Sequence, residues 1–154
     1  MTKAWGPAPK PLDVVWCNFP EQLTGSVPGP KPRPALVLDV DESTKPIYVK
    51  VAFGTSKKTA HLFSGEFQIA PADGSVFTES GCDGDTKFDL RRTAWLPFED
   101  TWFAPKADGK TPVMGHIDLK KSSEVKQRLR AIVETLAKEK LPEPKRVSSA
   151  GSPK

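Results

Sequence analysis

Four short segments in the first half of the chain are rich in β-branched and aromatic residues. They are 12–20 (LDVVWCNFP), 34–40 (PALVLDV), 46–54 (PIYVKVAFG) and a fourth around 61–70 (HLFSGEFQIA). The third segment alternates regularly, and one of its faces would carry Ile47, Val49, Val51 and Phe53. Such a composition is typical of strands. Because short turns join the four strands without an intervening helix, they predict an antiparallel meander or small barrel.

The second half of the chain begins with a polar, glycine-rich segment, 71–85, which predicts a long loop. Residues 86–103 return to an aromatic, strand-like composition, and 113–119 is a further short strand candidate. A helical pattern then runs from 122 to about 139. Its apolar stripe consists of Val125, Leu129, Ile132, Val133 and Leu136. The fold is therefore predicted to be mainly β (α+β), with a C-terminal amphipathic helix.

The ends of the predicted helix and of the chain set the domain limits. Ser122 is placed to cap the helix, and Pro142 lies beyond its last turn. Residues 1–11 contain three prolines and a glycine, which predicts a flexible N-terminal arm. Residues 141–154 are rich in proline, serine and lysine, which predicts a disordered basic tail. One domain is thus expected over 12–140.

Composition restricts the class of protein. The chain has 154 residues, 37% hydrophobic and 27% charged, which suits one domain with a modest core. It has no apolar run of about 18 residues and no apolar leader at its start, so we expect a cytoplasmic protein without a membrane partner. The net charge is +4, and residues 119–154 hold ten Lys or Arg against four Glu. This bias is compatible with a nucleic-acid partner, although basic ends are also common on proteins that bind none.

Few residues of this chain are suited to metal or nucleophilic chemistry. His61 and His116 are the only histidines, and neither has a metal-ligand neighbour at helical or hairpin spacing. We therefore expect no metal and no cofactor, while an acid–base role for the histidines stays open. Cys17 and Cys82 have no CxxC spacing and are expected to be reduced thiols.

The segment PGPKPRPALVLDV draws attention to one arginine. Arg33 lies between Pro32 and Pro34. Proline fixes its own φ and pushes the preceding residue into extended conformations, so the backbone around Arg33 has little freedom. An arginine is always protonated and can grip a phosphate with two donors. The segment therefore predicts either a prepared phosphate site or a rigid linker that carries an exposed arginine.

Several motifs together resemble one known family. DVVWCNFP, PRPALVLDV, FGTSKKT and KFDLRRTAWLP occur in the order of the strands and loops of the PemK/MazF family of toxin endoribonucleases. The resemblance covers roughly residues 12–137. It implies a small SH3-like antiparallel barrel of the PemK/MazF type with flanking helices. It also implies the toxin component of a toxin–antitoxin system, with a cognate antitoxin protein and a possible homodimer as partners.

The resemblance also implies a reaction and a site. The protein would cleave single-stranded RNA without a metal, by attack of a 2′-hydroxyl on the neighbouring phosphate to give a cyclic phosphate. Arg33 matches the catalytic arginine, and Thr55, or Ser56 after a shift of one residue, matches the catalytic hydroxyl. The residues expected to bind the RNA backbone are Lys31, Lys57, Lys58 and Arg91. Trp16 or Phe53 could stack a base, although core packing is the more usual role for both.

Two other functions fit parts of this sequence. A non-catalytic SH3-like barrel that binds protein or nucleic acid would share the fold without the activity. A ribonuclease that uses His61 or His116 would differ in its pH dependence, because histidines titrate near neutral pH whereas arginine does not.

Overall fold

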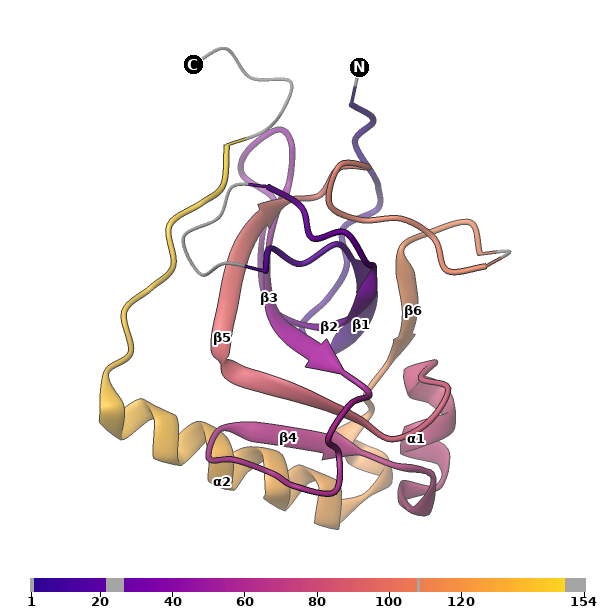
Figure 1. The fold of residues 1–154 in the computed structure, drawn as a ribbon, viewed down its shortest axis with the longest axis vertical. Helices are drawn as coiled ribbons and strands as arrows, with labels where there is room; N and C mark the ends of the chain where they lie inside the picture. Colours follow the sequence, from indigo (N-terminus) through magenta and orange to yellow (C-terminus); the bar gives the residue numbers. More distant parts are fainter. Residues whose placement is uncertain (1, 22–26, 108, 149–154) are drawn as a thin grey trace.

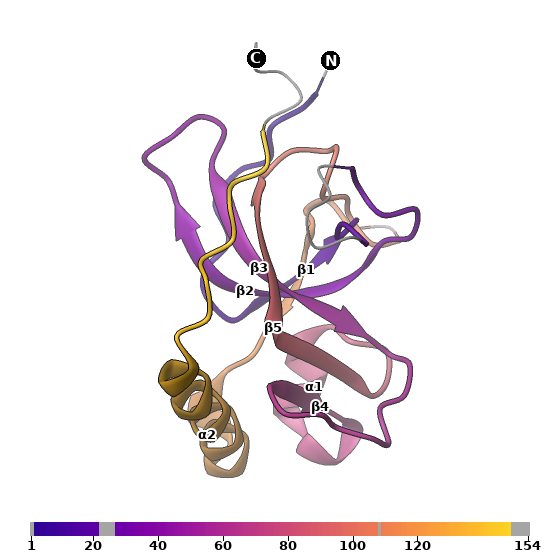
Figure 2. The same ribbon diagram turned by 60° about the vertical axis from the view of Figure 1, so that its left-hand side comes forward.

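The computed structural model describes residues 2–21, 27–107 and 109–148, and it consists of one curled antiparallel sheet with helices packed outside it (Figure 1). The strands are β1 (Asp13–Cys17), β2 (Arg33–Asp41), β3 (Tyr48–Thr55), β4 (Glu66–Ile69), β5 (Thr86–Pro97) and β6 (Val113–His116). Their order in the sheet is β4-β5-β3-β2-β1-β6. The mainly β class is confirmed, and the sheet curls into a partly closed barrel, as Figure 2 shows. The specific PemK/MazF barrel stays a prediction.

The two faces of the sheet bury separate apolar clusters. The inner cluster fills the concave side and includes Val15, Cys17, Ala35, Val37, Val49, Val51, Ala94, Leu96, Phe98, Trp102 and Phe103. The outer cluster includes Val14, Leu36, Ala52, Phe67, Ile69, Val76, Phe88, Leu90, Ile117, Val125 and Leu129. Neighbouring residues of one strand thus enter different clusters, because successive side chains of a strand point to opposite faces.

Helix α2 (Ser123–Glu139) covers the outer cluster, as the apolar stripe predicts. The Ser122 side chain accepts a hydrogen bond from the Val125 backbone N–H at 3.2 Å, so Ser122 is the N-cap. Val125 and Leu129 are buried, whereas Val133 is 50% exposed. The described structure therefore uses only part of the predicted stripe as core.

The segment 71–85 differs from its prediction as a long loop. It forms the 3₁₀ turn η1 (Pro71–Asp73) and the short helix α1 (Ser75–Ser80). Val76 of α1 is fully buried in the outer cluster. One helical turn is too short to show a periodic pattern, and its stability comes from this packing. A second short 3₁₀ turn, η2 (Leu119–Lys121), occupies the end of the predicted strand 113–119.

The predicted strand 86–103 ends at Pro97 in the structure. Beyond it, the chain turns back and inserts three aromatic side chains into the inner cluster, namely Phe98, Trp102 and Phe103. The N-terminal arm is attached at the same place. Trp5 donates a backbone hydrogen bond to the Phe98 carbonyl and an indole hydrogen bond to the Phe103 carbonyl, both at 2.9 Å. Residues 2–11, predicted to be flexible, thus include a docked tryptophan.

Residues 141–148 lie along the free edge of β5 (Figures 1 and 2), whereas the sequence predicts a disordered tail over 141–154. The last six residues of that predicted tail, 149–154, lie outside the described residues. The Val147 N–H donates to the Trp95 carbonyl at 3.0 Å, and the Trp95 indole donates to Glu143 at 2.7 Å. The Arg146 guanidinium lies 4.9 Å from the Trp95 ring centroid and pairs with Asp41 at 2.6 Å. The proline and serine content of this segment could not predict its contacts with Trp95 and Asp41, which are distant in the sequence.

Cys17 and Cys82 are free thiols, as expected. Cys17 is fully buried in the inner cluster, and this burial raises the pKa of its thiol. Among the described residues, no helix combines the length and apolar composition needed to cross a bilayer.

We expect that ending the chain at Lys140 will lower the melting temperature by several degrees, because Trp95 and β5 lose the partners that 141–148 provide. In a domain of this size, each kcal/mol lost corresponds to about 2–4 °C. The measurement is thermal unfolding followed by circular dichroism. A chain ending at Ser148 separates the effect of the docked segment from that of the last six residues. An unchanged melting temperature after truncation at Lys140 would contradict the docking.

Candidate functional site

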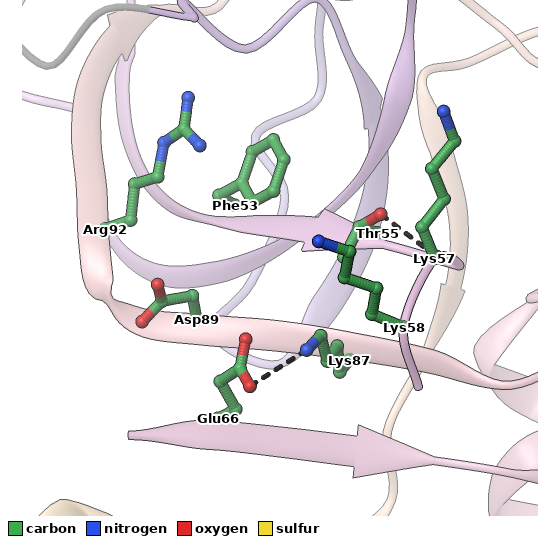
Figure 3. A pocket seen from close by; sticks show the side chains of 8 residues that line it. All are labelled: Phe53, Thr55, Lys57, Lys58, Glu66, Lys87, Asp89 and Arg92. Atoms are coloured by element: carbon green, nitrogen blue, oxygen red, sulfur yellow. Dashed lines mark hydrogen bonds and ion pairs between the residues drawn. The ribbon is translucent and has the colours of Figure 1, made fainter. Parts of the chain in front are cut away.

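A pocket of about 260 Å³ opens where β3, β4 and β5 meet (Figure 3). It is lined by Phe53, Thr55, Lys57, Lys58, Glu66, Lys87, Asp89 and Arg92. Four of these eight side chains are cationic and two are carboxylates. The pocket is therefore suited to an anionic ligand.

Strand register explains how the centre of the pocket is assembled. Phe53 pairs with Asp89, and Thr55 pairs with Lys87, in the antiparallel ladder between β3 and β5. Residues two apart on a strand share a face, so these four side chains project to one side of the sheet. Asp89 also pairs with Glu66 of β4, which extends the same surface onto the next strand.

An irregularity in β5 adds Arg92 to this surface. Phe53 pairs with Asp89 while the adjacent Ala52 pairs with Thr93, so β5 contains three additional residues between the two pairs. An odd number of additional residues reverses the alternation of the strand. Accordingly, Phe88 before the irregularity packs in the outer cluster, whereas Ala94 after it packs in the inner cluster. Arg92 therefore joins the pocket face.

The Arg92 guanidinium is held against an aromatic ring. It lies 4.1 Å from the Phe53 ring centroid, and its Nη2 donates to the Glu21 carbonyl at 2.7 Å. Its buried Nε has no hydrogen-bond partner among the described residues. Burial lowers the pKa of Arg92, Asp89 raises it, and the positive charge of Arg33 lowers it further. The group stays cationic nevertheless, since arginine titrates far above neutral pH.

Arg33 is the first residue of β2 and approaches the same aromatic ring. Its guanidinium carbon lies 5.5 Å from the Phe53 ring centroid. Next to this contact, Gly54 lets the backbones of β2 and β3 lie close together, because a Cβ there would lie 2.1 Å from the Pro34 carbonyl oxygen. Arg33 and Arg92, which come from different strands, thus both contact Phe53.

A buried ion pair forms the floor of the pocket. The Lys87 ammonium lies 2.9 Å from Glu66 Oε1 and donates to the His61 carbonyl at 3.0 Å. The side chains of Lys87 and Glu66 are only 5% and 11% exposed. Glu66 also accepts a hydrogen bond from the Phe63 N–H at 2.7 Å. The pair therefore joins β4 and β5 to the turn that precedes β4.

The structure brings together some of the sequence-predicted site residues. Thr55, Lys57 and Lys58 line the pocket, and Arg33 contacts its Phe53. The Thr55 Oγ accepts a hydrogen bond from the Lys57 N–H at 3.1 Å, so its hydroxyl hydrogen can be donated elsewhere. Phe53, one of the two proposed stacking residues, contacts both guanidinium groups.

Other predicted residues lie outside the pocket lining. Ser56 and Lys31 are exposed on adjoining segments. Arg91 points away, where its guanidinium pairs with Glu139 of α2 and donates to Ser64. Because adjacent residues of a strand face opposite sides, the sequence allows at most one of Arg91 and Arg92 to face a given site, and Arg91 is the one expected to bind RNA. In the structure Arg92 faces the pocket instead, because the irregularity in β5 decides which of the two does so.

Four pocket residues were missed from the sequence: Glu66, Lys87, Asp89 and Arg92. Alternation along TKFDLRR places Lys87 and Asp89 on one face and could have suggested those two. The histidines lie on separate elements, with His61 before β4 and His116 on β6, 2.7 Å from Asp13. Within the described residues, no three side chains of His, Cys, Asp or Glu are grouped as metal ligands.

Neither a scan against protein-family models nor a search of curated proteins gives a match for this chain.

We expect Glu66→Gln to destabilise the protein by about 2 kcal/mol, since it leaves the buried Lys87 ammonium without a counter-charge. The melting temperature should fall by roughly 4–8 °C. Glu79→Gln is the matched control, because Glu79 pairs with Lys121 on the exposed surface and should change the melting temperature little. Equal melting temperatures for the two variants would contradict the importance of the buried pair.

Proposed function

We propose that the pocket binds the backbone of single-stranded RNA and catalyses its cleavage, as the PemK/MazF resemblance implies. The observation that supports this most is the pair of guanidinium groups on Phe53, beside the Thr55 hydroxyl. Two arginines fixed around one ring form a cationic site before any ligand arrives. Such fixed charges favour a phosphate whose negative charge increases during reaction.

The charge balance of the pocket supports an anionic substrate. The lining has four cations against Glu66 and Asp89, and Arg33 adds a fifth cation nearby. The Glu66 carboxylate is neutralised by Lys87. Figure 3 shows the Lys58 ammonium directed toward the middle of the pocket. A phosphodiester backbone matches this excess of positive charge.

The proposed reaction needs no group beyond these side chains and the substrate. The 2′-oxygen forms a bond to the adjacent phosphorus, and the bond from phosphorus to the 5′-oxygen breaks. The products are a 2′,3′-cyclic phosphate and a 5′-hydroxyl. Arg33 and Arg92 stabilise the non-bridging oxygens, to which Thr55 donates a hydrogen bond. Such interactions accelerate the reaction where they are stronger in the transition state than in the ground state.

Asp89 is the best placed of the lining residues to accept the 2′ proton. It projects into the pocket between Arg92 and Glu66 (Figure 3). Its Oδ1 accepts a hydrogen bond from the Arg91 N–H at 2.9 Å, which leaves Oδ2 for the substrate. Glu66 is less suitable, because its carboxylate is ion-paired with the buried Lys87 ammonium. The departing 5′-oxygen takes its proton from the Lys58 ammonium.

The antitoxin and the homodimer that the resemblance implies stay predictions. The non-catalytic alternative would use the same cationic pocket to bind RNA without cleaving it. Only an activity measurement separates these two functions.

We expect the purified protein to cut a long single-stranded RNA in the presence of EDTA, leaving cyclic phosphate ends. Arg33→Ala should lower kcat/KM by on the order of 10²–10³-fold, since one fixed donor to the phosphate is lost. Arg130→Ala is the control, because it removes an exposed arginine of α2. Intact RNA after incubation with the folded wild type would favour the binding function, and full activity of Arg33→Ala would refute the assigned role.

Asp89→Asn tests the proton acceptor separately from binding. The amide keeps an oxygen for the Arg91 N–H but has no basic oxygen, so kcat should fall by on the order of 10²–10⁴-fold with little change in KM. The measurement is steady-state cleavage of a fluorescent oligonucleotide. A proportional rise in KM at unchanged kcat would instead assign Asp89 to substrate binding.

A further inference from the structure

The turn before β4 exposes apolar side chains next to the pocket. Phe63 is 62% exposed and Leu62 is 49% exposed, while most other large apolar side chains of the described structure are buried or partly covered. The His61 ring packs against Phe63 in an edge-on arrangement, with ring centroids 4.7 Å apart. A ligand that covers this exposed aromatic pair would remove apolar surface from water, which is favourable and which folding alone does not do.

This aromatic turn, defined as His61, Leu62 and Phe63, is held in place through its backbone. Glu66 accepts from the Phe63 N–H at 2.7 Å, and its own N–H donates to the Phe63 carbonyl at 3.0 Å. Lys87 donates to the His61 carbonyl at 3.0 Å. The buried ion pair therefore fixes the turn, and a ligand that contacts it need not order the backbone first.

The aromatic turn and the pocket share the same anchoring residues. Glu66 and Lys87 line the pocket and also bind the turn. The Lys87 ammonium lies 5.5 Å from the Phe63 ring centroid. An exposed aromatic ring beside a cationic pocket is the combination by which proteins bind single-stranded nucleic acid, with bases stacked on rings and phosphates on cations.

We propose that Phe63, supported by His61, is a stacking subsite for a nucleobase of the strand whose phosphate occupies the pocket. This inference rests on the proposed RNA function and adds a second contact point to it. Nucleic acid suits the turn better than an apolar protein segment because the adjoining pocket is cationic. Stacking on a ring is tolerant of base identity, so Phe63 contributes affinity for any base.

The test compares two oligonucleotides that the protein cannot cleave, because the 2′-oxygen is methylated or absent. One is a fluorescent single-stranded 2′-O-methyl RNA, and the other is an abasic oligonucleotide of equal length and charge. Binding is measured by fluorescence anisotropy. Phe63→Ala should weaken binding of the base-bearing strand by about 5-fold or more. It should leave binding of the abasic strand unchanged, and Phe63→Trp should retain wild-type affinity.

Leu62→Ala is the matched control, because it removes another exposed apolar side chain from the same turn without removing a ring. Equal affinity of wild type and Phe63→Ala for the base-bearing strand would overturn the subsite and leave the RNA function standing. Equal weakening of both strands would overturn stacking as the role of Phe63. Weaker binding of a fluorescent Glu-rich peptide by Phe63→Ala, with RNA binding unchanged, would assign the turn to a protein partner. If wild type binds neither strand, the proposed function fails as well.

Discussion

The bend of β5 at Leu90–Arg92 is the feature on which the rest of the structure depends. Before the bend, β5 pairs with both β3 and β4, and after it, β5 pairs with β3 while its other edge contacts residues 141–148. The bend keeps its backbone groups satisfied. The Leu90 N–H donates to the Gly65 carbonyl at 2.9 Å, and the Arg91 N–H donates to Asp89. An irregular strand segment is stable only when such partners exist.

This bend also gives two adjacent arginines different surroundings. Arg91 leaves the sheet toward α2, where Glu139 raises its pKa through a hydrogen bond, and it thereby ties the helix to the strand. Arg92 turns inward onto Phe53, where no carboxylate pairs with it directly among the described residues. Two adjacent cations of the same type thus lie in different environments. The difference lies in the partners that the bend gives them.

The buried Lys87–Glu66 pair connects the proposed catalytic pocket to the aromatic turn. A buried pair adds little net stability, because desolvation of both charges offsets their attraction. Its value here is positional, since it fixes the floor of the pocket and the backbone of His61 and Phe63 at once. The aromatic rings and the cations of the site are thus held by the same ion pair, which is the combination that the proposed binding of single-stranded RNA needs.

The sequence by itself determined the approximate positions of the strands and the C-terminal helix, because alternation and helical spacing are local properties. It could not determine which of Arg91 and Arg92 enters the pocket. The alternation of inward and outward side chains along β5 reverses at the bend, and no glycine or proline marks the bend in the sequence. Nor could the sequence place α1 or residues 141–148, whose order comes from Val76 in the outer cluster and from Trp95. Only the tertiary structure decided these features, because they depend on contacts between residues distant in the chain.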